Sequence, residues 1–164
     1  ITTTLLQLAR AYSVIANGGY NISPKLIRKA EKVKKEKILS SEVSKKILPI
    51  LRKVVTTKEG TASLANVSGY EVGGKTGTAQ KSIAGIYTKK KINSFVSVFP
   101  TSNPKFVLAV MLDEPKTNEN YIYHFRDGSN IKYKGTPYNT AGWTAVEVTG
   151  QIIEKIGPIL ATKY

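Results

Sequence analysis

Cysteine is absent from this sequence, and histidine and tryptophan each occur only once. Without thiols, disulfide bonds and thiolate metal sites are excluded. With His124 as the only imidazole, the chain cannot build a metal or catalytic site that needs two histidines. We therefore expect neither a metal ion nor a cofactor.

Long hydrophobic runs are absent as well. The longest, Phe106 to Leu112, is far shorter than the roughly 20 residues that a helix needs to cross a bilayer. The chain opens on Ile1, without a methionine and without a basic and hydrophobic leader. We therefore expect a piece of a longer protein, which at 164 residues is large enough for one domain with a hydrophobic core.

Acidic residues are scarce. The chain has 11 of them against 25 lysines and arginines, so its formal net charge is +14. Such a charge is compatible with nucleic-acid binding. The basic residues are almost all lysines, however, and a solvated basic surface accounts for them better. We expect no nucleic acid as the main partner, while an anionic membrane surface or an acidic polymer stays open.

The first residues predict an amphipathic helix, in the stretch TLLQLARAYSVIANGG. Thr4 and Gln7 have the spacing of a capping box, and Gly18 with Gly19 provides the stop. The basic stretch that follows, residues 24–37, fits no single period. A helix and an exposed strand or hairpin both stay open there.

Two further helices are expected. One begins at Ser40 and Ser41, and its expected apolar side consists of Val43, Ile47, Ile50, Leu51 and Val54. The other closes the chain, and its expected apolar positions are Ala145, Val146, Thr149, Ile152, Ile153, Ile156 and Leu160. The last helix needs a sheet to cover.

The middle of the chain predicts that sheet. The stretch SFVSVF has the alternation of a strand, and residues 100–104 predict a turn into a second strand, FVLAVML. Two strands joined in this way form an antiparallel hairpin. GGKTGTAQ, residues 73–80, lies just before it and is placed to pair as a third strand. The layout predicts an α+β fold, an antiparallel sheet covered by helices.

One connection is unusually long. Residues 114–140 are rich in asparagine, tyrosine and lysine, and they predict a long polar loop or an insertion. No internal repeat or linker divides the sequence. We therefore expect a single, partial domain over residues 1–164.

The stretch GGKTGTAQ allows more than one interpretation. Together with Gly69, the residues Gly74, Lys75 and Thr76 formally match the phosphate loop G-x-x-x-x-G-K-[ST]. A phosphate loop opens a helix, whereas strands follow here. The segment before it is a serine-rich loop and not a buried strand, so the nucleotide-binding interpretation is set aside.

A strand edge that holds a substrate fits this stretch better. A carbonyl substrate with a free carboxylate needs a cation, hydroxyl groups, a backbone N–H aimed at the developing oxyanion, and room for close approach. Lys75, the hydroxyls of Thr76 and Thr78, the Thr78 amide and Gly77 supply these features. On a strand, Lys75 and Gly77 share one face, and Thr76 and Thr78 share the other.

Four stretches of the chain follow one another as ITTTLLQLARAYSVIANGG, GTASLANVSGYEVGGKTGTAQK, INSFVSVFPTSNPKFVLAVMLDEPK and TAGWTAVEVTGQIIEKI. Together they resemble the C-terminal part of the transpeptidase domain of class B penicillin-binding proteins, most closely the septal, cell-division type. The tripeptide K-T-G is one of the three signature motifs of penicillin-binding proteins and serine β-lactamases. The resemblance implies part of a fold of that type.

In this family, a serine of an S-x-x-K motif attacks the D-Ala-D-Ala amide of the peptidoglycan stem peptide, and β-lactams mimic that donor. The resemblance implies that Lys75 shapes the electrostatics of the site and that the Thr78 amide is an oxyanion donor. Lys75 and Thr78 are thus the expected catalytic residues. Lys75, Thr76, Gly77 and Thr78 are the expected substrate-binding residues.

The other two motifs of the family do not occur where it needs them. Ser102 to Lys105 and Ser129 to Lys132 match S-x-x-K, but both follow the K-T-G strand, the first in a turn and the second in the polar loop. We interpret both as chance matches. No S-x-N string occurs anywhere. We therefore expect the chain alone to be inactive.

Three other residues bear on the resemblance. Leu5 stands where the family usually has a proline that opens the first helix. His124 is expected to face solvent. Trp143 is expected to pack the last helix onto the sheet, with substrate stacking as the alternative.

The resemblance also implies partners and a location. The partners are the stem peptide, β-lactam antibiotics and other division or cell-wall synthesis proteins, at the periplasmic face of the bacterial cytoplasmic membrane, with an anchor upstream of this chain. Surfaces of a partial domain also predict self-association. Two alternatives stay open: a β-lactamase or β-lactam sensor with the same K-T-G strand, and a basic nucleic-acid-binding module.

Overall fold

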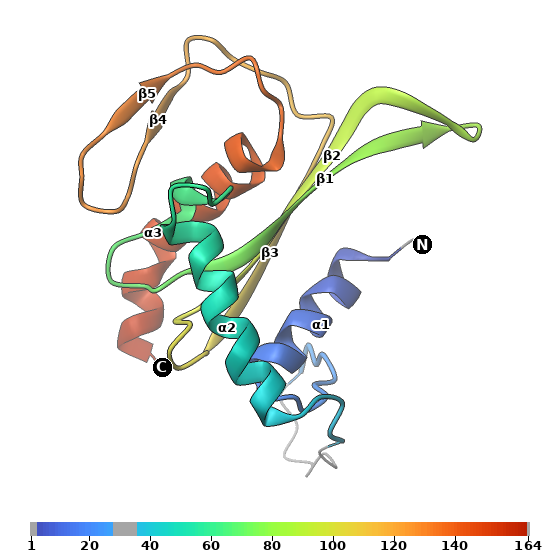
Figure 1. The fold of residues 1–164 in the computed structure, drawn as a ribbon, viewed down its shortest axis with the longest axis vertical. Helices are drawn as coiled ribbons and strands as arrows, with labels where there is room; N and C mark the ends of the chain where they lie inside the picture. The colour runs from blue at the N-terminus through green and yellow to red at the C-terminus, as the bar shows by residue number, and fades with distance from the viewer. Residues whose placement is uncertain (1–2, 28–35, 164) are drawn as a thin grey trace.

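The computed structural model describes residues 3–27 and 36–163 of the chain. Within these ranges, three α-helices accompany a central three-stranded sheet and a separate two-stranded sheet (Figure 1). The layout confirms the predicted α+β fold, an antiparallel sheet covered by helices.

The central sheet has the strand order β1–β2–β3 and is antiparallel throughout. β1 spans Gly73–Ile83, β2 spans Ile86–Phe99 and β3 spans Phe106–Asp113. GGKTGTAQ is therefore the third strand that its position predicts. Because β2 is the middle strand, β1 lies at an edge of the described sheet, where backbone groups that point away from β2 can meet a further chain.

α1 spans Leu5–Ala16 and confirms the first predicted helix. The Gln7 N–H donates to the Thr4 hydroxyl oxygen at 3.1 Å, and the Thr4 N–H donates to the Gln7 side-chain oxygen at 2.8 Å. These two bonds form the predicted capping box. After the helix, Gly18 and Gly19 have φ angles of 67° and 93°, which glycine adopts without strain, and the chain turns back there.

α2 spans Ser41–Thr56 and begins where the sequence predicts, but its predicted buried face is partly wrong. The residues that it buries are Ser44, Leu48, Leu51 and Val55. Val43 and Ile50, both expected on the apolar side, are exposed. The Ser44 hydroxyl donates to the Ile15 carbonyl of α1, so a polar contact helps to set which side of α2 faces the protein. An apolar pattern cannot indicate such a contact.

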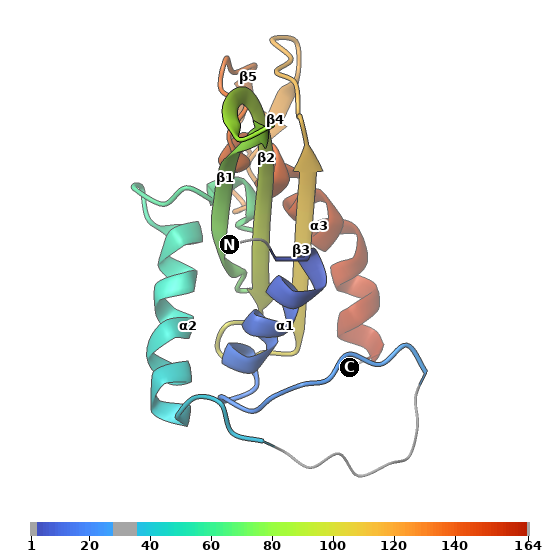
Figure 2. The same ribbon diagram turned by 90° about the vertical axis from the view of Figure 1, so that its right-hand side faces the viewer.

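α3 spans Ala145–Lys163 and confirms the predicted last helix. It covers one face of the central sheet, α1 covers the opposite face, and α2 stands beside β1 (Figure 2). Although α3 has 19 residues, no helix in the described ranges combines the length and the apolar character that crossing a membrane requires.

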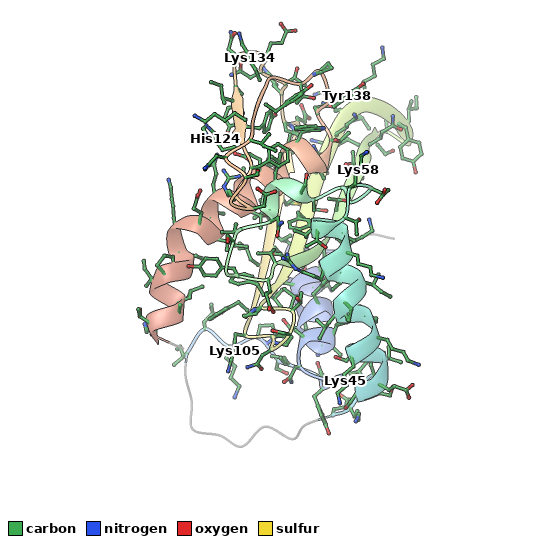
Figure 3. The ribbon with its side chains drawn as sticks, turned by 60° about the vertical axis from the view of Figure 1, so that its left-hand side comes forward. Lys45, Lys58, Lys105, His124, Lys134 and Tyr138 are labelled. Atoms are coloured by element: carbon green, nitrogen blue, oxygen red, sulfur yellow. The ribbon has the colours of Figure 1, made fainter. Side chains whose placement is uncertain are left out.

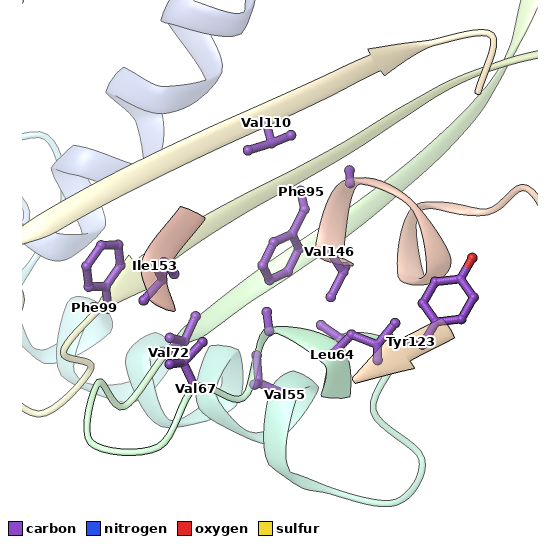
Figure 4. Packing of buried hydrophobic residues seen from close by; sticks show 13 residues of the cluster. Val55, Leu64, Val67, Val72, Phe95, Phe99, Val110, Tyr123, Val146 and Ile153 are labelled. Carbon is purple, nitrogen blue, oxygen red and sulfur yellow. The ribbon is translucent and has the colours of Figure 1, made fainter. Parts of the chain in front are cut away.

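Both faces of the last part of β2, residues 95–99, are buried, which confirms the predicted alternation of this stretch. Phe95 and Phe99 point into the main hydrophobic cluster, where Ile153 of α3 meets them (Figure 4). Val98 points the other way, into a second cluster with Leu51 of α2. A strand buried on both sides is held firmly in place, and it fixes the position of the edge strand that pairs with it.

The predicted polar connection, residues 114–140, contains a small hairpin of its own. β4, Ile122–His124, pairs antiparallel with β5, Lys132–Lys134. This hairpin lies beyond the N-terminal end of α3 (Figure 1). His124 is exposed at the end of β4, which confirms that it faces solvent (Figure 3).

The exposed lysines are dispersed over the surface. Lys45 and Lys58 lie near opposite ends of α2, Lys105 lies before β3, and Lys134 lies in β5 (Figure 3). In the basic stretch, Tyr20 and Lys37 form an isolated antiparallel bridge, and the described residues beside it are not helical. The rest of that stretch, residues 28–35, lies outside the described residues.

The core under α3 predicts a stability difference between two isoleucines of that helix. Ile153 is fully buried, whereas Ile159 is 63% exposed. Ile153→Ala should lower the free energy of unfolding by about 2–5 kcal/mol, because it leaves a cavity in the main cluster. Ile159→Ala, the matched control, should change it by no more than about 0.5 kcal/mol. Denaturant titration of both variants checks this, and equal effects would contradict the packing described here.

Candidate functional site

The motif residues 75–78 lie on β1 and divide between its two faces as predicted. A Cβ at Gly74 would meet the Phe95 ring at 2.6 Å, so the even-numbered residues of β1 face the main cluster and α3. A Cβ at Gly73 would meet the backbone nitrogen of Arg52 in α2 at 2.9 Å, so the odd-numbered residues face the opposite side. Thr76 and Thr78 thus share the α3 side, and the other two motif residues share the α2 side.

An open pocket of about 340 Å³ lies against the α3 side of β1. One wall is β1, another is the loop that precedes the strand in sequence, and a third is the segment that leads into α3. The residues that line it are Gly60, Thr61, Ser63, Leu64, Thr76, Thr78, Thr140, Gly142 and Trp143. Both motif threonines therefore reach one pocket, which the sequence could not establish.

The two threonine hydroxyls of this pocket are held by neighbours. The Thr76 and Thr61 hydroxyl oxygens are 2.9 Å apart, so one donates to the other. The Ala141 N–H donates to the Thr78 hydroxyl oxygen at 2.9 Å. Because Thr78 accepts this bond, its own hydroxyl proton remains available for donation to an anion in the pocket. Thr61 and Ala141 were not singled out from the sequence; the G-T-A string before the motif strand was the only signal for Thr61.

On the other face of β1, Gly77 borders a second, wider hollow, and Lys75 is exposed to solvent. The Lys75 ammonium group donates to the Thr76 carbonyl oxygen at 2.8 Å. None of the ion pairs of the described residues includes Lys75. Gly77 lines an open hollow of about 630 Å³, and a Cβ at this position would come within 2.7 Å of the Ser94 hydroxyl. Lys75 and Gly77 thus share one face of β1, where Gly77 leaves room beside Ser94.

Trp143 forms part of the pocket wall and has aromatic partners that the sequence did not predict. Its ring lies 5.0 Å from the ring of Tyr123 and 5.3 Å from that of Tyr133, between centroids. These tyrosines belong to β4 and β5, so Trp143 joins the start of α3 to the β4–β5 hairpin. It also packs against the main hydrophobic cluster, to which Phe95 and Phe99 of the central sheet belong, in agreement with the expected position against the sheet. The contact with the hairpin was not predicted, because these strands lie in a segment whose polar composition predicts a loop.

A buried ion pair supports the same wall from behind. Arg126 donates to both carboxylate oxygens of Glu147, at 2.8 and 2.9 Å, and each side chain is only 5% exposed. The same guanidinium donates to the Leu64 carbonyl at 3.1 Å and to Glu154 at 3.0 Å. Because Leu64 lines the pocket, Arg126 connects α3, the hairpin and the pocket loop.

The charges around Arg126 determine its protonation and that of a neighbour. Burial on its own lowers the pKa of Arg126, but the hydrogen bonds and charges of Glu147 and Glu154 outweigh burial and raise it. Burial raises the pKa of Tyr121, and so does the hydrogen bond that its hydroxyl donates to Glu147 at 2.9 Å. Near pH 7, Arg126 is therefore a cation and Tyr121 is a neutral phenol.

Both S-x-x-K strings begin in connections between strands and not at the start of a helix. Ser102 is in the turn between β2 and β3, where its hydroxyl and N–H donate to Glu71 and hold the pKa of that carboxyl below its usual range. Ser129 lies in the β4–β5 connection, where its N–H donates to Asp127 at 2.9 Å. Neither serine opens a helix.

The residues of the formal phosphate loop form a turn and a strand. In the described ranges, no three His, Asp or Glu side chains gather as metal ligands.

Comparison with known proteins finds a family model and relatives that match most of this chain. The family model of the penicillin binding protein transpeptidase domain matches residues 1–127. A probable peptidoglycan D,D-transpeptidase FtsI from Caulobacter vibrioides is 33% identical, over 96% of this chain and 26% of its own length. Stage V sporulation protein D of Bacillus subtilis is 37% identical, over 71% of this chain and 20% of its own length. The chain thus spans about a quarter or less of these relatives.

Solved structures agree with the sequence relatives. The apo transpeptidase domain of penicillin-binding protein 3 from Burkholderia pseudomallei superposes with a TM-score of 0.70 at 30% identity, over 96% of this chain and 43% of that one. Penicillin-binding protein 3 of Mycobacterium tuberculosis in complex with aztreonam gives a TM-score of 0.72 at 26% identity, over 94% of this chain and 36% of that one.

The buried ion pair behind the pocket predicts a large stability effect. Arg126→Met should lower the free energy of unfolding by about 3–5 kcal/mol, because it leaves Glu147 buried without its cation. The double variant Arg126→Met with Glu147→Gln should be more stable than the single variant, since no unpaired charge remains.

Lys46→Met serves as the control for this ion pair. It breaks the Lys46–Glu42 pair, whose side chains are 72% and 74% exposed, and it should have almost no effect. Thermal and denaturant unfolding of the three variants provides the measurement. A double variant less stable than Arg126→Met would contradict the role given to the pair.

Proposed function

The chain belongs to the penicillin-binding protein transpeptidase family, and we propose that it contributes the substrate-binding strand of a serine D,D-transpeptidase that cross-links peptidoglycan. The observation that carries this proposal is the K-T-G-T sequence at an edge of the sheet, with its two threonine hydroxyls in one pocket and its lysine on the opposite face. The D,D-transpeptidase names of the relatives support the same reaction.

The proposed reaction is a two-step acyl transfer. A serine outside this chain attacks the carbonyl carbon between the two D-alanines of a stem peptide. The serine oxygen forms an ester with that carbon, the C–N bond breaks, and the terminal D-alanine leaves with a proton on its nitrogen. An amine of a neighbouring stem peptide then attacks the ester, forms the new amide and returns the proton to the serine. A β-lactam is attacked in the same way, but its ring amide opens and its amine stays attached.

The residues of β1 have separate roles in this proposal. The Thr76 and Thr78 hydroxyls donate to the carboxylate of the terminal D-alanine or of the drug. The Thr78 N–H donates to the oxyanion that develops when the serine attacks. Lys75 provides positive charge beside the attacking serine, and Gly77 lets the substrate approach the strand. The substrate lies along the edge of β1 as an added strand.

The proposed partners and location follow from this reaction. Stem peptides and β-lactams are the ligands, and other proteins of division or cell-wall synthesis accompany the enzyme. Peptidoglycan lies outside the cytoplasmic membrane, so we place this domain at the periplasmic face, with an anchor in a segment upstream of the chain. Exposed apolar residues such as Ile50 and Met111, which are 60% and 50% exposed, support contacts with the rest of the protein or with a second copy.

A labelling experiment tests the proposed reaction. The full-length protein that contains this chain should be acylated covalently by a fluorescent penicillin, whereas the 164-residue chain alone should not, because it has no serine in the catalytic position. Gel fluorescence and mass spectrometry of the intact proteins provide the measurement. Labelling of the short chain at Ser102 or Ser129 would contradict the assignment of the nucleophile to another segment.

A substitution of the motif lysine tests the role of this strand. In the full-length protein, Lys75→Ala should slow acylation roughly a hundredfold, because it removes the cation beside the reacting serine. Lys105→Ala removes an exposed lysine far from the pocket and should leave the rate unchanged. If Lys75→Ala reacted as fast as the Lys105→Ala control, the proposed site would be wrong.

A further inference from the structure

Asn93 is a fully buried polar residue at the centre of the contacts around Thr78. It lies on β2 directly opposite Thr78 in the β1–β2 register and is 0% exposed. Opposite residues of an antiparallel pair share a face of the sheet, so Asn93 is on the α3 side, as Thr78 is. The sequence did not single it out, because an asparagine between Ile92 and Ser94 gives no signal of its burial.

The Asn93 amide group ties β2 to the segment that leads into α3. Its Nδ2 donates to the Asn139 carbonyl at 2.8 Å and to the Thr144 hydroxyl oxygen at 2.8 Å. The Thr144 hydroxyl in turn donates to the Thr140 carbonyl at 2.9 Å. These bonds hold both ends of residues 139–144, and the N–H that meets the Thr78 hydroxyl, that of Ala141, lies between them.

The contacts therefore form a closed circuit. It runs from Thr78 across the sheet to Asn93, from there to residues 139 and 144, and back to the Thr78 hydroxyl through Ala141. A second tether reinforces it from the same strand, since the Lys91 ammonium group donates to the Asn139 side-chain oxygen at 2.7 Å. Because the Ala141 N–H occupies one lone pair of the Thr78 hydroxyl oxygen, the hydroxyl proton must point away from Ala141. The positions from which this hydroxyl can donate are therefore restricted.

One atom of Asn93 destabilises the folded protein, which indicates that this residue does more than fill the core. Its Oδ1 atom is buried and has no hydrogen-bond partner among the described residues. A buried acceptor without a partner destabilises the folded state, so packing alone would favour an apolar residue at this position. The favourable contribution of Asn93 is therefore the pair of hydrogen bonds that it donates to residues 139 and 144.

We propose that Asn93 is a positioning residue that orients the Thr78 hydroxyl toward the substrate carboxylate, through the segment of residues 139–144. This inference rests on the proposed function, because it assumes that Thr78 binds the carboxylate. Asn93 itself touches no substrate; it fixes the Ala141 N–H that sets the direction of the hydroxyl. Preorganisation of this kind matters for a charged ligand, since the donor is already in place when the anion arrives.

The test compares a carboxylate with its ester. In the full-length protein, the acylation rate constant is measured with benzylpenicillin and with benzylpenicillin methyl ester, and their ratio reports the preference for the carboxylate. Asn93→Ala should lower this ratio about tenfold, as expected for a weakened hydrogen bond to a charged group. A residue that serves stability alone would lower both rates equally and leave the ratio unchanged.

Further variants locate the effect. Thr144→Val keeps the size of the side chain but removes the hydroxyl that accepts from Asn93. It should lower the ratio as Asn93→Ala does. If Asn93→Ala fails to fold, Thr144→Val still tests the proposal. Thr144→Ser should restore the ratio. Ser97→Ala is the matched control: Ser97 is fully buried on the same strand, and its hydroxyl donates to the Leu108 carbonyl at 3.1 Å, away from the pocket. It should leave the ratio unchanged.

A double-variant comparison distinguishes the two levels of the proposal. Thr78→Val should lower the ratio by itself, and adding Asn93→Ala should then change it no further, because the hydroxyl that Asn93 orients is gone. The positioning role is wrong if Thr78→Val lowers the ratio but Asn93→Ala and Thr144→Val do not. It is also wrong if Asn93→Ala lowers the ratio further in the Thr78→Val background, by the same factor as in the unchanged protein. In both cases the proposed function stands. If the full-length protein is not acylated by benzylpenicillin at all, the proposed function fails and the inference fails with it.

Discussion

The pairing of β1 with β2 is the interaction on which the candidate site depends. β2 is buried on both faces, by Phe95 and Phe99 on one side and by Val98 on the other, so its position is fixed by the core. β1 takes its register from β2, and that register decides that the motif threonines face one pocket while Lys75 is exposed on the opposite face of the strand. A shift by one residue would exchange the two faces.

The second constraint is on the walls that face this strand. They come from segments far away in sequence, and buried polar contacts hold them at two levels. Arg126 joins Glu147 of α3 to the pocket loop at Leu64, and Asn93 joins the central strand to residues 139–144. Buried polar groups of this kind are costly unless they are paired, so they specify one arrangement of the walls. A site that must recognise a carboxylate gains from such rigidity, because its donors need no rearrangement on binding.

Much of the fold was predictable because local chemistry determines it. The capping box at Thr4 sets the start of α1, and the alternation of the SFVSVF stretch sets a strand buried on both sides. The sites of error depend on contacts between distant segments. Ser44 is buried on α2 because it meets α1, and the tyrosines that Trp143 contacts lie on a hairpin within a connection that was predicted as a polar loop. Lys75 and its neighbours can be proposed from the sequence because their chemistry lies in one short string, whereas Asn93 is visible only from its partners in space.

The edge of β1 is proposed to bind the carboxylate and the oxyanion of an acyl-enzyme. A crystal structure of the full-length protein acylated by benzylpenicillin is the most direct test of this proposal. We expect the drug carboxylate within hydrogen-bond distance of the Thr76 and Thr78 hydroxyls, and the acyl carbonyl oxygen at the Thr78 N–H. A drug bound covalently elsewhere, or with its carboxylate turned away from both threonines, would contradict it.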